Sequence, residues 1–490
     1  MRHNKWTMVA VGLATFMTYL DNNIVNVAIP SLQRDLGLST AGIEWVVSGY
    51  ILTFAGLLLA GGRLADAFGR RRLFLLGLAV FTTSSLFAGL AGGAATLIAA
   101  RGVQGVGAAL VTPTTLAIIS ATFTDPRERN AAVGIWGGAG ALALAVGPVI
   151  GGLLTQHLSW EWIFWINVPV GIATMALGAW AIEESREARV RRLDRGGLVF
   201  STVSLFSLTW ALIEGHDRGW TSASILGTFA LAAAAGLAFV VVERRVADPM
   251  VDVSLFARRE FSGGIMALML WAFGLFGIYF FTALYLQGVL GFSPTKAGAA
   301  FVPMAVLMAA SSILSDRVAA RFGAHRSTAV GMVMMGLAIA SVSLLGRDAT
   351  FWSLMPSFAV IGVGGGLIMP LTATVLAVMP SEQAGVASAV FNASREVAGL
   401  LGITVIGAVL TSRQGAALAG GSTPADAYLD GFRWGLILAA VLVLAGAAAA
   451  YVSLRSSKNG VPVPGQIGGQ TDGQTDGQTD GGREDLVLVG

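Results

Sequence analysis

Charged side chains inside long apolar runs are the first candidates for chemistry in this sequence. Asp21 lies in the apolar run of residues 7–29, and Arg101 lies in the run of residues 95–118. A charge at the centre of a membrane-spanning helix costs about 2.5–3.5 kcal/mol on insertion scales, so it needs a partner, a hydrated cavity or a function. If the chain starts in the cytoplasm, the rise of an α-helix puts both side chains about 21–25 Å deep, at similar levels in the membrane.

Two roles are open for this pair of opposite charges. Burial favours the protonated form of a carboxyl group, whereas a neighbouring guanidinium favours the ionised form. A movement that changes the distance between the two groups would therefore load or release a proton. Our hypothesis is that Asp21 binds and releases the coupling proton and that Arg101 tunes it. The alternative is a static ion pair that locks the first half of the chain together.

A second group of polar residues falls in the run of residues 386–411, near the predicted midplane. Arg395 and Glu396 are adjacent there, and adjacent side chains on a helix point about 100° apart, so we expect that they do not satisfy each other. Asn392 shares a helix face with both of them. Three roles are open: contact with a substrate, a second protonation site, or a network that packs helices.

The run of residues 261–285 is rich in aromatic side chains. We expect some of them, with Trp271 and Tyr279 as candidates, to contribute to an apolar cavity for a substrate. Side chains at this density cover most of a helix face, so many of them must meet lipid.

Glycine and proline in the run of residues 131–154 have a mechanical interpretation. Gly147, Pro148, Gly151 and Gly152 follow one another within six residues. Small residues at such spacing let helix backbones approach closely, and a proline removes one backbone hydrogen bond and favours a bend. We interpret this segment as a packed, hinge-like region between two half-domains, not as a ligand site.

The composition requires these side chains to be positioned by helices in a membrane. Hydrophobic residues make up 55% of the 490 residues and charged residues only 12%, about half of what a soluble domain carries. A membrane-spanning helix needs about 20 predominantly apolar residues. Fourteen runs of that size are present, at residues 7–29, 43–62, 73–92, 95–118, 131–154, 163–182, 197–214, 222–242, 261–285, 297–315, 328–346, 352–376, 386–411 and 433–454.

The distribution of basic residues and a weak internal repeat give the predicted topology. Most of the 31 Lys and Arg residues fall in segments that share one side with the N-terminus, which predicts that both termini are cytoplasmic. Residues 62–72 and 316–326 both place Phe-Gly and a basic end at the same offset, as expected after duplication of a six-helix unit. The predicted domains are a six-helix bundle at residues 1–182, a linker with two extra helices at 183–260, a second bundle at 261–454 and a disordered tail at 455–490.

Several classes of function are disfavoured by what the sequence lacks. It has no cysteine and four histidines without metal-ligand spacing, so neither a thiolate site nor a metal enzyme is expected. No nucleophile–base pair or phosphate-binding loop is evident, so we expect no enzyme and no bound cofactor. The net charge of +3 comes from short basic clusters between apolar runs, which is a membrane-topology pattern and gives no reason to expect nucleic-acid binding.

Several short motifs, in order along the chain, resemble the major facilitator superfamily, specifically its fourteen-helix drug:proton antiporter family. Residues 20–30 resemble the first-helix signature of that family, and residues 62–72 resemble the conserved loop motif of the superfamily. Residues 101–107 resemble the fourth-helix motif, and residues 147–152 resemble the antiporter motif of the fifth helix. The segments 162–171 and 292–303 also resemble that family.

This resemblance implies an all-α membrane protein with two six-helix bundles and two inserted helices, which rock between inward-open and outward-open states. It implies a proton-coupled exporter of drugs, antibiotics or other small amphiphilic compounds in the plasma membrane, acting as a monomer with the lipid bilayer, substrate and protons as its only partners. The loop residues Gly62, Asp66, Gly69 and Arg70 would form a conformational switch, in which Asp66 contacts a cytoplasmic helix end and steadies the outward-open state. A transporter of a physiological metabolite, such as an amino acid, peptide or lipid precursor, is the alternative.

The sequence departs from the family pattern at a few positions. Asn23 stands where the family often has threonine, beside Asp21, and Ala320 replaces the acidic residue in the second copy of the loop. Glu396 stands where a neutral residue is expected. This last departure could add a second proton site and alter the proton stoichiometry.

Overall fold

The computed structural model describes residues 2–186, 194–377 and 384–455. Residues 1–457 form one compact unit. The prediction of a disordered tail falls, apart from Arg455, outside the described residues, as does part of the predicted linker.

Helices account for nearly all of the described chain. The predicted break between residues 92 and 95 lies in the short connection between α3 and α4, and each predicted apolar run coincides with a helix or with two consecutive helices. The helices are α1 (Arg2–Leu36), α2 (Thr40–Phe68), α3 (Arg70–Gly89), α4 (Ala94–Thr122), α5 (Pro126–His157), α6 (Trp162–Trp165), α7 (Asn167–Ala181), α8 (Arg195–Arg218), α9 (Ala223–Glu243), η1 (Val253–Ala257), α10 (Arg259–Leu284), η2 (Tyr285–Val289), α11 (Pro294–Phe322), α12 (Ala324–Val342), α13 (Phe351–Gly366), α14 (Pro370–Ala377), α15 (Ala384–Ala419) and α16 (Pro424–Leu454).

Within the described residues, 12 helical segments are long and apolar enough to cross a membrane. The helices α1 and α12 hold the other two predicted runs but fall outside this set. Polar residues lower the hydropathy of both: α1 carries Asp21 and three asparagines near its middle, and α12 is 19 residues long and begins with His325 and Arg326.

The two copies of the repeated loop have the same local geometry. Gly69 separates α2 from α3 and Gly323 separates α11 from α12, with φ angles of 108° and 88°. Residues with a Cβ atom rarely adopt these angles, so glycine allows a reversal of direction without an intervening loop. In each loop the backbone N–H of the glycine donates to the fourth residue before it, Ala65 or Ala319.

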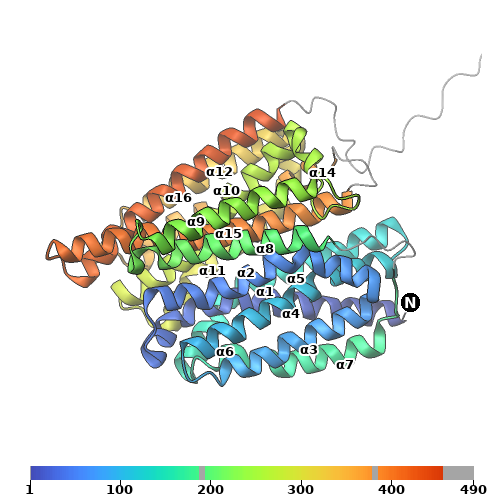
Figure 1. Cartoon of the computed structure of the whole chain (residues 1–490), viewed down its shortest axis with the longest axis horizontal. Helices are drawn as coiled ribbons and strands as arrows, with labels where there is room; N and C mark the ends of the chain where they lie inside the picture. The colour runs from blue at the N-terminus through green and yellow to red at the C-terminus, as the bar shows by residue number, and fades with distance from the viewer. Residues whose placement is uncertain (1, 187–193, 378–383, 456–490) are drawn as a thin grey trace, which may run out of the picture. The chain divides into compact units, whose positions relative to one another are not determined.

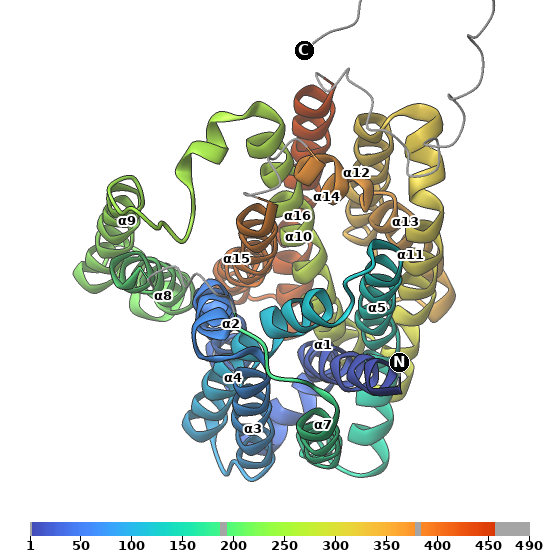
Figure 2. The same cartoon turned by 90° about the vertical axis from the view of Figure 1, so that its right-hand side faces the viewer.

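The helices pack as two bundles with a hairpin beside them (Figures 1 and 2). We call α1–α7 the N-terminal bundle, in which α1 packs on α4, α5 and α7 while α4 packs on α2 and α3. We call α10–α16 the C-terminal bundle, in which α10, α12 and α15 pack on α16 and α11 packs on α13. The hairpin α8–α9 lies to one side, and α8 contacts both α2 and α15.

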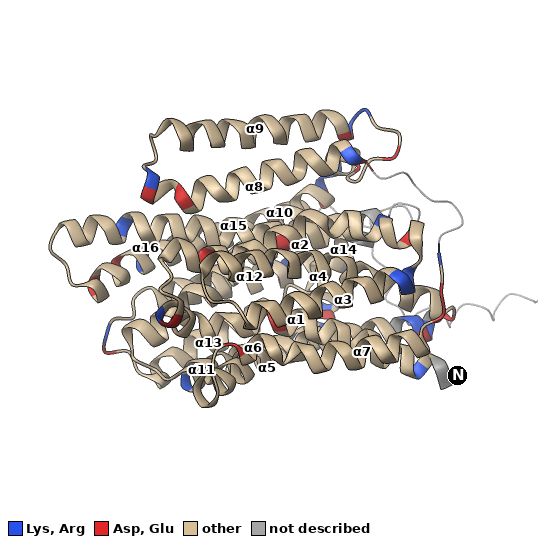
Figure 3. Ribbon diagram, turned by 60° about the horizontal axis from the view of Figure 1, so that its bottom comes forward, with Lys and Arg blue, Asp and Glu red and all other residues tan. Residues whose placement is uncertain are grey.

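Charged residues gather mainly at the ends of the helices (Figure 3). Among the described residues, four charged side chains are instead buried within a helix and away from its last turn: Asp21 and Arg101 are 0% exposed, Glu44 is 2% exposed and Glu396 is 3% exposed. Because each such charge is costly in an apolar interior, these four positions are the places to look for function.

Candidate functional site

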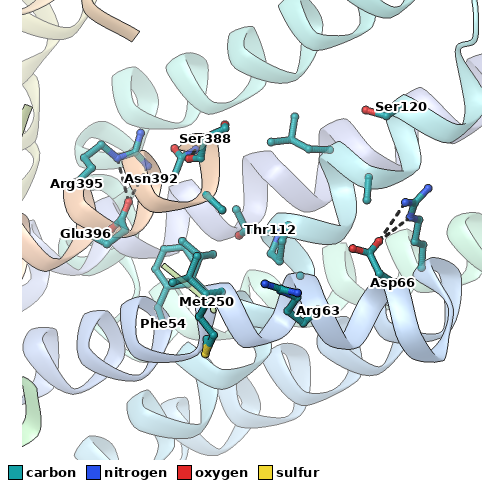
Figure 4. A pocket seen from close by; sticks show the side chains of 18 of the residues that line it. Phe54, Arg63, Asp66, Thr112, Ser120, Met250, Ser388, Asn392, Arg395 and Glu396 are labelled. Atoms are coloured by element: carbon teal, nitrogen blue, oxygen red, sulfur yellow. Dashed lines mark hydrogen bonds and ion pairs between the residues drawn. The ribbon is translucent and has the colours of Figure 1, made fainter. Parts of the chain in front are cut away.

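A cavity of about 600 Å³ lies between the two bundles. Figure 4 shows Ser388, Asn392, Arg395 and Glu396 of α15 at one part of its wall, with Asp66 of α2 at another. Its described lining residues are Tyr19, Phe54, Leu58, Leu59, Gly62, Arg63, Asp66, Arg70, Thr112, Pro113, Leu116, Ala117, Ser120, Trp136, Met250, Ser388, Ala389, Asn392, Arg395 and Glu396.

The cavity extends toward the end of the bundles that carries the start of the chain. Thr7 donates to the carbonyl of Ala181 at this end, and Arg71, at the start of α3, reaches the carbonyl of Ala179. Asp66 and Arg70 on the cavity wall therefore belong to the same end. We call it the open end.

At the opposite end the two bundles touch, and we call this the closed end. Thr295 of α11 donates from its backbone N–H to the side-chain oxygen of Gln156 at 3.2 Å, and its hydroxyl donates to the carbonyl of Gly152 at 3.3 Å. The amide of Gln287 donates to the carbonyl of Val27 of α1 at 2.8 Å. These hydrogen bonds therefore close the space between the bundles at this end.

Arg395 and Glu396 pair with each other, which corrects the expectation that they could not. Arg395 Nη2 and Nε lie 2.7 Å and 3.1 Å from the same Glu396 oxygen, Oε1. The long arginine side chain curls along the helix surface, so the 100° between the two Cβ directions does not limit the reach of the guanidinium. The other oxygen of Glu396 is buried without a partner among the described residues.

Arg395 also links the two bundles, because its Nη2 donates to the hydroxyl of Tyr19 on α1 at 3.1 Å. Asn392 lies on the cavity wall, and its amide donates to the carbonyl of Ser388 one turn earlier. The three polar residues predicted on this helix are thus gathered at one cavity. Tyr19 completes the group, although its type alone gave no signal in the sequence.

The cavity wall does not include Trp271 or Tyr279, the aromatic candidates on α10, in this conformation. Trp271 is 6% exposed and Tyr279 is 4% exposed. The ring of Tyr279 stacks on Phe301 of α11 at 4.9 Å between centroids, because α10 turns this face into the C-terminal bundle. Their contact with a substrate stays a prediction.

Asp21 and Arg101 form a buried ion pair, as their similar predicted depth allows. Arg101 Nη1 lies 2.5 Å from Asp21 Oδ2. The other oxygen of Asp21 accepts from the side-chain amides of Gln104 at 2.7 Å and Asn167 at 2.8 Å. Arg101 also donates to Gln104 and to the carbonyl of Val46, and its guanidinium lies over the Tyr50 ring.

This network lies inside the N-terminal bundle rather than on the cavity wall. Ser85 of α3 receives both amides, from Gln104 and Asn167, so α1, α3, α4 and α7 meet at one polar centre. All five side chains are almost completely buried, so none of them faces lipid. In this conformation the two side chains are paired, and both the proton-coupling role and the static role stay predictions.

Sequence reasoning missed Gln104, Asn167 and Ser85 as members of this network. Gln104 follows Arg101 by three residues and therefore shares its helix face, which was an available signal. Asn167 sits in an apolar stretch, where an amide needs a partner. Ser85 carried no such signal, because a serine in a helix often satisfies itself with a backbone carbonyl of the preceding turn.

The loop between α2 and α3 is held within the N-terminal bundle. Asp66 pairs with Arg70 at 3.1 Å, across Gly69, so its contact is with the first turn of α3. The carboxylate of Glu184, which follows α7, accepts the backbone N–H groups of Arg71 and Arg72 and caps α3. A side chain at Gly69 would collide with this carboxylate, so glycine is needed for the cap as well as for its φ angle.

The glycines of α5 allow close approach on two sides. A Cβ atom at Gly147 would meet Asn23 of α1 at 3.1 Å, and one at Gly151 would meet the carbonyl oxygen of Ile24 at 2.6 Å. Toward the other bundle, a Cβ atom at Gly152 would collide with the backbone of Pro294, and one at Gly298 with the carbonyl of Pro148. The segment therefore lies between the two bundles, as its sequence predicted.

One cavity residue comes from a segment that the sequence did not mark as functional. Met250, between α9 and α10, lies on the wall, so the connection after the inserted hairpin contributes to the cavity (Figure 4). Arg63 of α2 donates to the carbonyl of Pro249 at 2.7 Å and holds that connection in place.

Two helical bundles around a central cavity are an arrangement suited to a membrane transporter. The chain belongs to the Major Facilitator Superfamily, whose family model matches residues 11–403. It is therefore a multi-pass protein of the plasma membrane and a member of a family of transporters rather than enzymes.

Two curated relatives and one solved structure illustrate the similarity. The chain is 37% identical over 434 residues to the puromycin resistance protein of Streptomyces alboniger, covering 87% of this chain and 86% of the relative. It is 35% identical to the tetracenomycin C resistance and export protein of Streptomyces glaucescens, over 85% of this chain and 78% of the relative. A crystal structure of an auto-inhibited POT family peptide transporter has the same fold, with a TM-score of 0.68, 16% identity and coverage of 94% of this chain and 99% of that one.

Proposed function

We propose that the protein is a proton-coupled exporter of small amphiphilic compounds, such as antibiotics and other drugs, that works by alternating access. The observation that carries this proposal is the cavity of about 600 Å³ between the two bundles, which hydrogen bonds join beyond one of its ends. A cavity of this size suits a drug-sized molecule, for which pockets of about 300–1,000 Å³ are typical.

The proposed topology has fourteen membrane spans, with both termini in the cytoplasm. In this scheme α1 and α12 span the membrane beside the 12 more apolar segments, because each packs along the helices of its own bundle. The open end carries the start of the chain, so the cavity faces the cytoplasm and the conformation is inward-open. A substrate would enter from the cytoplasm or the inner leaflet.

The chemistry of the cavity supports an amphiphilic substrate. Phe54, Leu58 and Trp136 offer apolar surface. Asn392 and the Arg395–Glu396 pair, which lie on the wall contributed by α15, offer hydrogen-bond donors and an acceptor. The relatives named for resistance to puromycin and tetracenomycin C make these two compounds the first candidates to test. In this proposal the protein works as a monomer without a bound cofactor, and the coupling ion is the proton.

In the proposed cycle, a proton from outside is exchanged for an outgoing substrate, with Asp21 as the coupling carboxylate and Arg101 as its modulator. The energy suffices: the membrane potential supplies about 2.3 kcal/mol per charge per 100 mV. Since about 1.4 kcal/mol corresponds to a tenfold ratio, one proton at 100 mV sustains roughly a fifty-fold gradient of a neutral substrate. Glu396 is a candidate for a second proton.

Transport in proteoliposomes tests this proposal. The purified protein is reconstituted with a panel of amphiphilic compounds, including puromycin, and a pH gradient is imposed in either direction. We expect substrate to move against its gradient toward the acidic compartment, and a protonophore to abolish this movement. Transport that is equally fast without a pH gradient or a potential would refute proton coupling, and transport of no amphiphile in the panel would refute the proposed substrate class.

A further inference from the structure

Glu44 is a buried acidic residue for which neither the fold nor the ion pair at Asp21 provides an explanation. It lies on α2, about 6 Å along the helix from its start at Thr40, at the closed end. Its side chain is 2% exposed, and no donor among the described residues bonds to its carboxyl group. A buried carboxylate without a donor is strongly disfavoured, so such a group either finds a partner or keeps its proton.

The carboxyl group of Glu44 faces the other bundle. A Cβ atom at Gly407 of α15 would lie 2.6 Å from Glu44 Cδ and 2.7 Å from its Oε2, so the carboxyl group occupies the space that the glycine leaves free. The contact of α2 with α15 is one of those that join the two bundles. If the bundles separate at the closed end, α15 therefore moves away from the Glu44 carboxyl group and exposes it.

No cation among the described residues is paired with Glu44. Asp217 of α8 is close enough to repel a negative charge on it. Glu214 of α8 accepts from the indole of Trp45 and pairs with Arg218, which is therefore engaged elsewhere. Away from the open end, the other charged or titratable side chains on the elements packed against α2 are His216 of α8, Tyr19, Arg34 and Asp35 of α1, the Asp21–Arg101 pair, and Arg395, Glu396 and Arg413 of α15.

None of these basic groups bonds to Glu44. Arg101 is held by Asp21, Gln104 and Val46, and Arg413 lies over the ring of Trp434. His216 lies close to Gly415, two turns beyond Gly407 on α15. One turn along α2, the hydroxyl of Ser48 is buried without a hydrogen-bond partner among the described residues.

We propose that Glu44 is a proton-binding site that controls the closed end: protonated, it lets α2 pack on α15, and ionised, it holds the two bundles apart there. The inference rests on the proposed alternation between two open states but not on the substrate or on Asp21. When the bundles separate at this end, the carboxyl group meets external water and ionises. Closure then requires a proton taken from outside.

The sign of the pH dependence follows from this difference in protons bound. The closed form holds one proton more than the separated form, so raising the pH favours separation. Above about pH 5, where an exposed glutamate is ionised, the ratio of separated to closed forms rises by up to about tenfold per pH unit from this one site. Other carboxyl groups can add to this pH dependence, so the test compares the wild-type protein with a variant that lacks only the Glu44 carboxyl group.

Spin labels report the separation directly. The chain has no cysteine, so cysteines at Thr40 of α2 and Ser412 of α15 are the only labelling sites in the full-length protein. The distance distribution between them is recorded in lipid nanodiscs from pH 5 to pH 9, for the wild-type background, E44Q and H216Q. The H216Q variant is a control, because it removes the imidazole of His216, a titratable group of α8 that lies close to α15.

We expect E44Q to match the wild-type background at pH 5, since the amide mimics the protonated acid, and this match also shows that the variant is folded. The slope of interest is that of the logarithm of the ratio of separated to closed forms against pH. This slope should be lower in E44Q by about one log unit per pH unit, while H216Q keeps the wild-type slope. An unchanged slope in E44Q, or a loss confined to H216Q, would overturn the proposal. A failure of drug transport in proteoliposomes would refute the proposed function separately, because the distance measurement does not involve a substrate.

Discussion

Replacing Gly298 with alanine is expected to separate the two bundles at the closed end. Gly298 of α11 packs against the backbone of α5, on the other bundle. A Cβ atom there would lie 2.7 Å from the carbonyl carbon of Pro148 and 3.3 Å from the Cα of Val149, and closer still to the Pro148 oxygen. Carbon atoms in contact normally lie about 3.5–4.0 Å apart, so the helices must move apart by roughly 1 Å.

The size of the expected shift follows from the free-energy cost of adding a methyl group to a tightly packed contact between two backbones. The clash is with backbone, which cannot rotate away, and inserting a methyl group into a well-packed core typically costs about 1–3 kcal/mol. Only the state with α5 against α11 bears this cost. At about 1.4 kcal/mol per tenfold, the ratio of closed to separated forms should fall by roughly 5- to 150-fold.

The labels at Thr40 and Ser412 measure this change at constant pH. The matched control is Gly134→Ala on α5, where an added Cβ atom meets nothing within 4 Å. We expect G298A to shift the distance distribution toward the longer, separated form and G134A to leave it as in the parent. If G298A shows the parent distribution while remaining folded, the bundles are not held together by close backbone approach, and the reasoning fails.

Three further predictions concern the ion pair and the cavity. Asp21→Asn should abolish transport driven by a pH gradient and, because it leaves the buried guanidinium of Arg101 uncompensated, lower the unfolding free energy by about 3–5 kcal/mol; coupled transport by a folded D21N protein would contradict it. Gln104→Leu should cost about 1–3 kcal/mol in thermal unfolding by removing a donor to Asp21, and no loss would mean that the network does not stabilise the bundle. Met250→Trp should raise the KM for bulky substrates more than for small ones in the vesicle assay, and an equal effect on both would remove Met250 from the cavity wall.

The sequence was informative wherever a feature depends on residues close together along the chain. Long apolar runs predict helices because every backbone polar group must be satisfied within a helix in lipid. Asp21 and Arg101 were recognisable as partners from depth alone, because helix rise converts residue number into distance. The glycines at 147–152 marked a close approach, and they do lie against Ile24 on one side and Pro294 on the other.

Which side chains meet each other was decided by tertiary structure alone. The sequence interpretation kept Arg395 and Glu396 apart because it considered Cβ directions, whereas the long arginine side chain reaches both Glu396 and Tyr19. Trp271 and Tyr279 looked like cavity residues by type, but the rotation of α10 turns Tyr279 onto Phe301. The sequence determines which residues share a face of a helix. Which of these faces meets water, protein or lipid depends on the neighbouring helices.

Glu44 illustrates the same division. The sequence places an acidic residue near the start of an apolar run, where a charge at a membrane surface is unremarkable. Only the packing of α15 against α2, with glycine at position 407, puts that carboxyl group between two bundles without a donor. The energy of a buried charge depends on its surroundings rather than on its residue type, so its role is set by the fold.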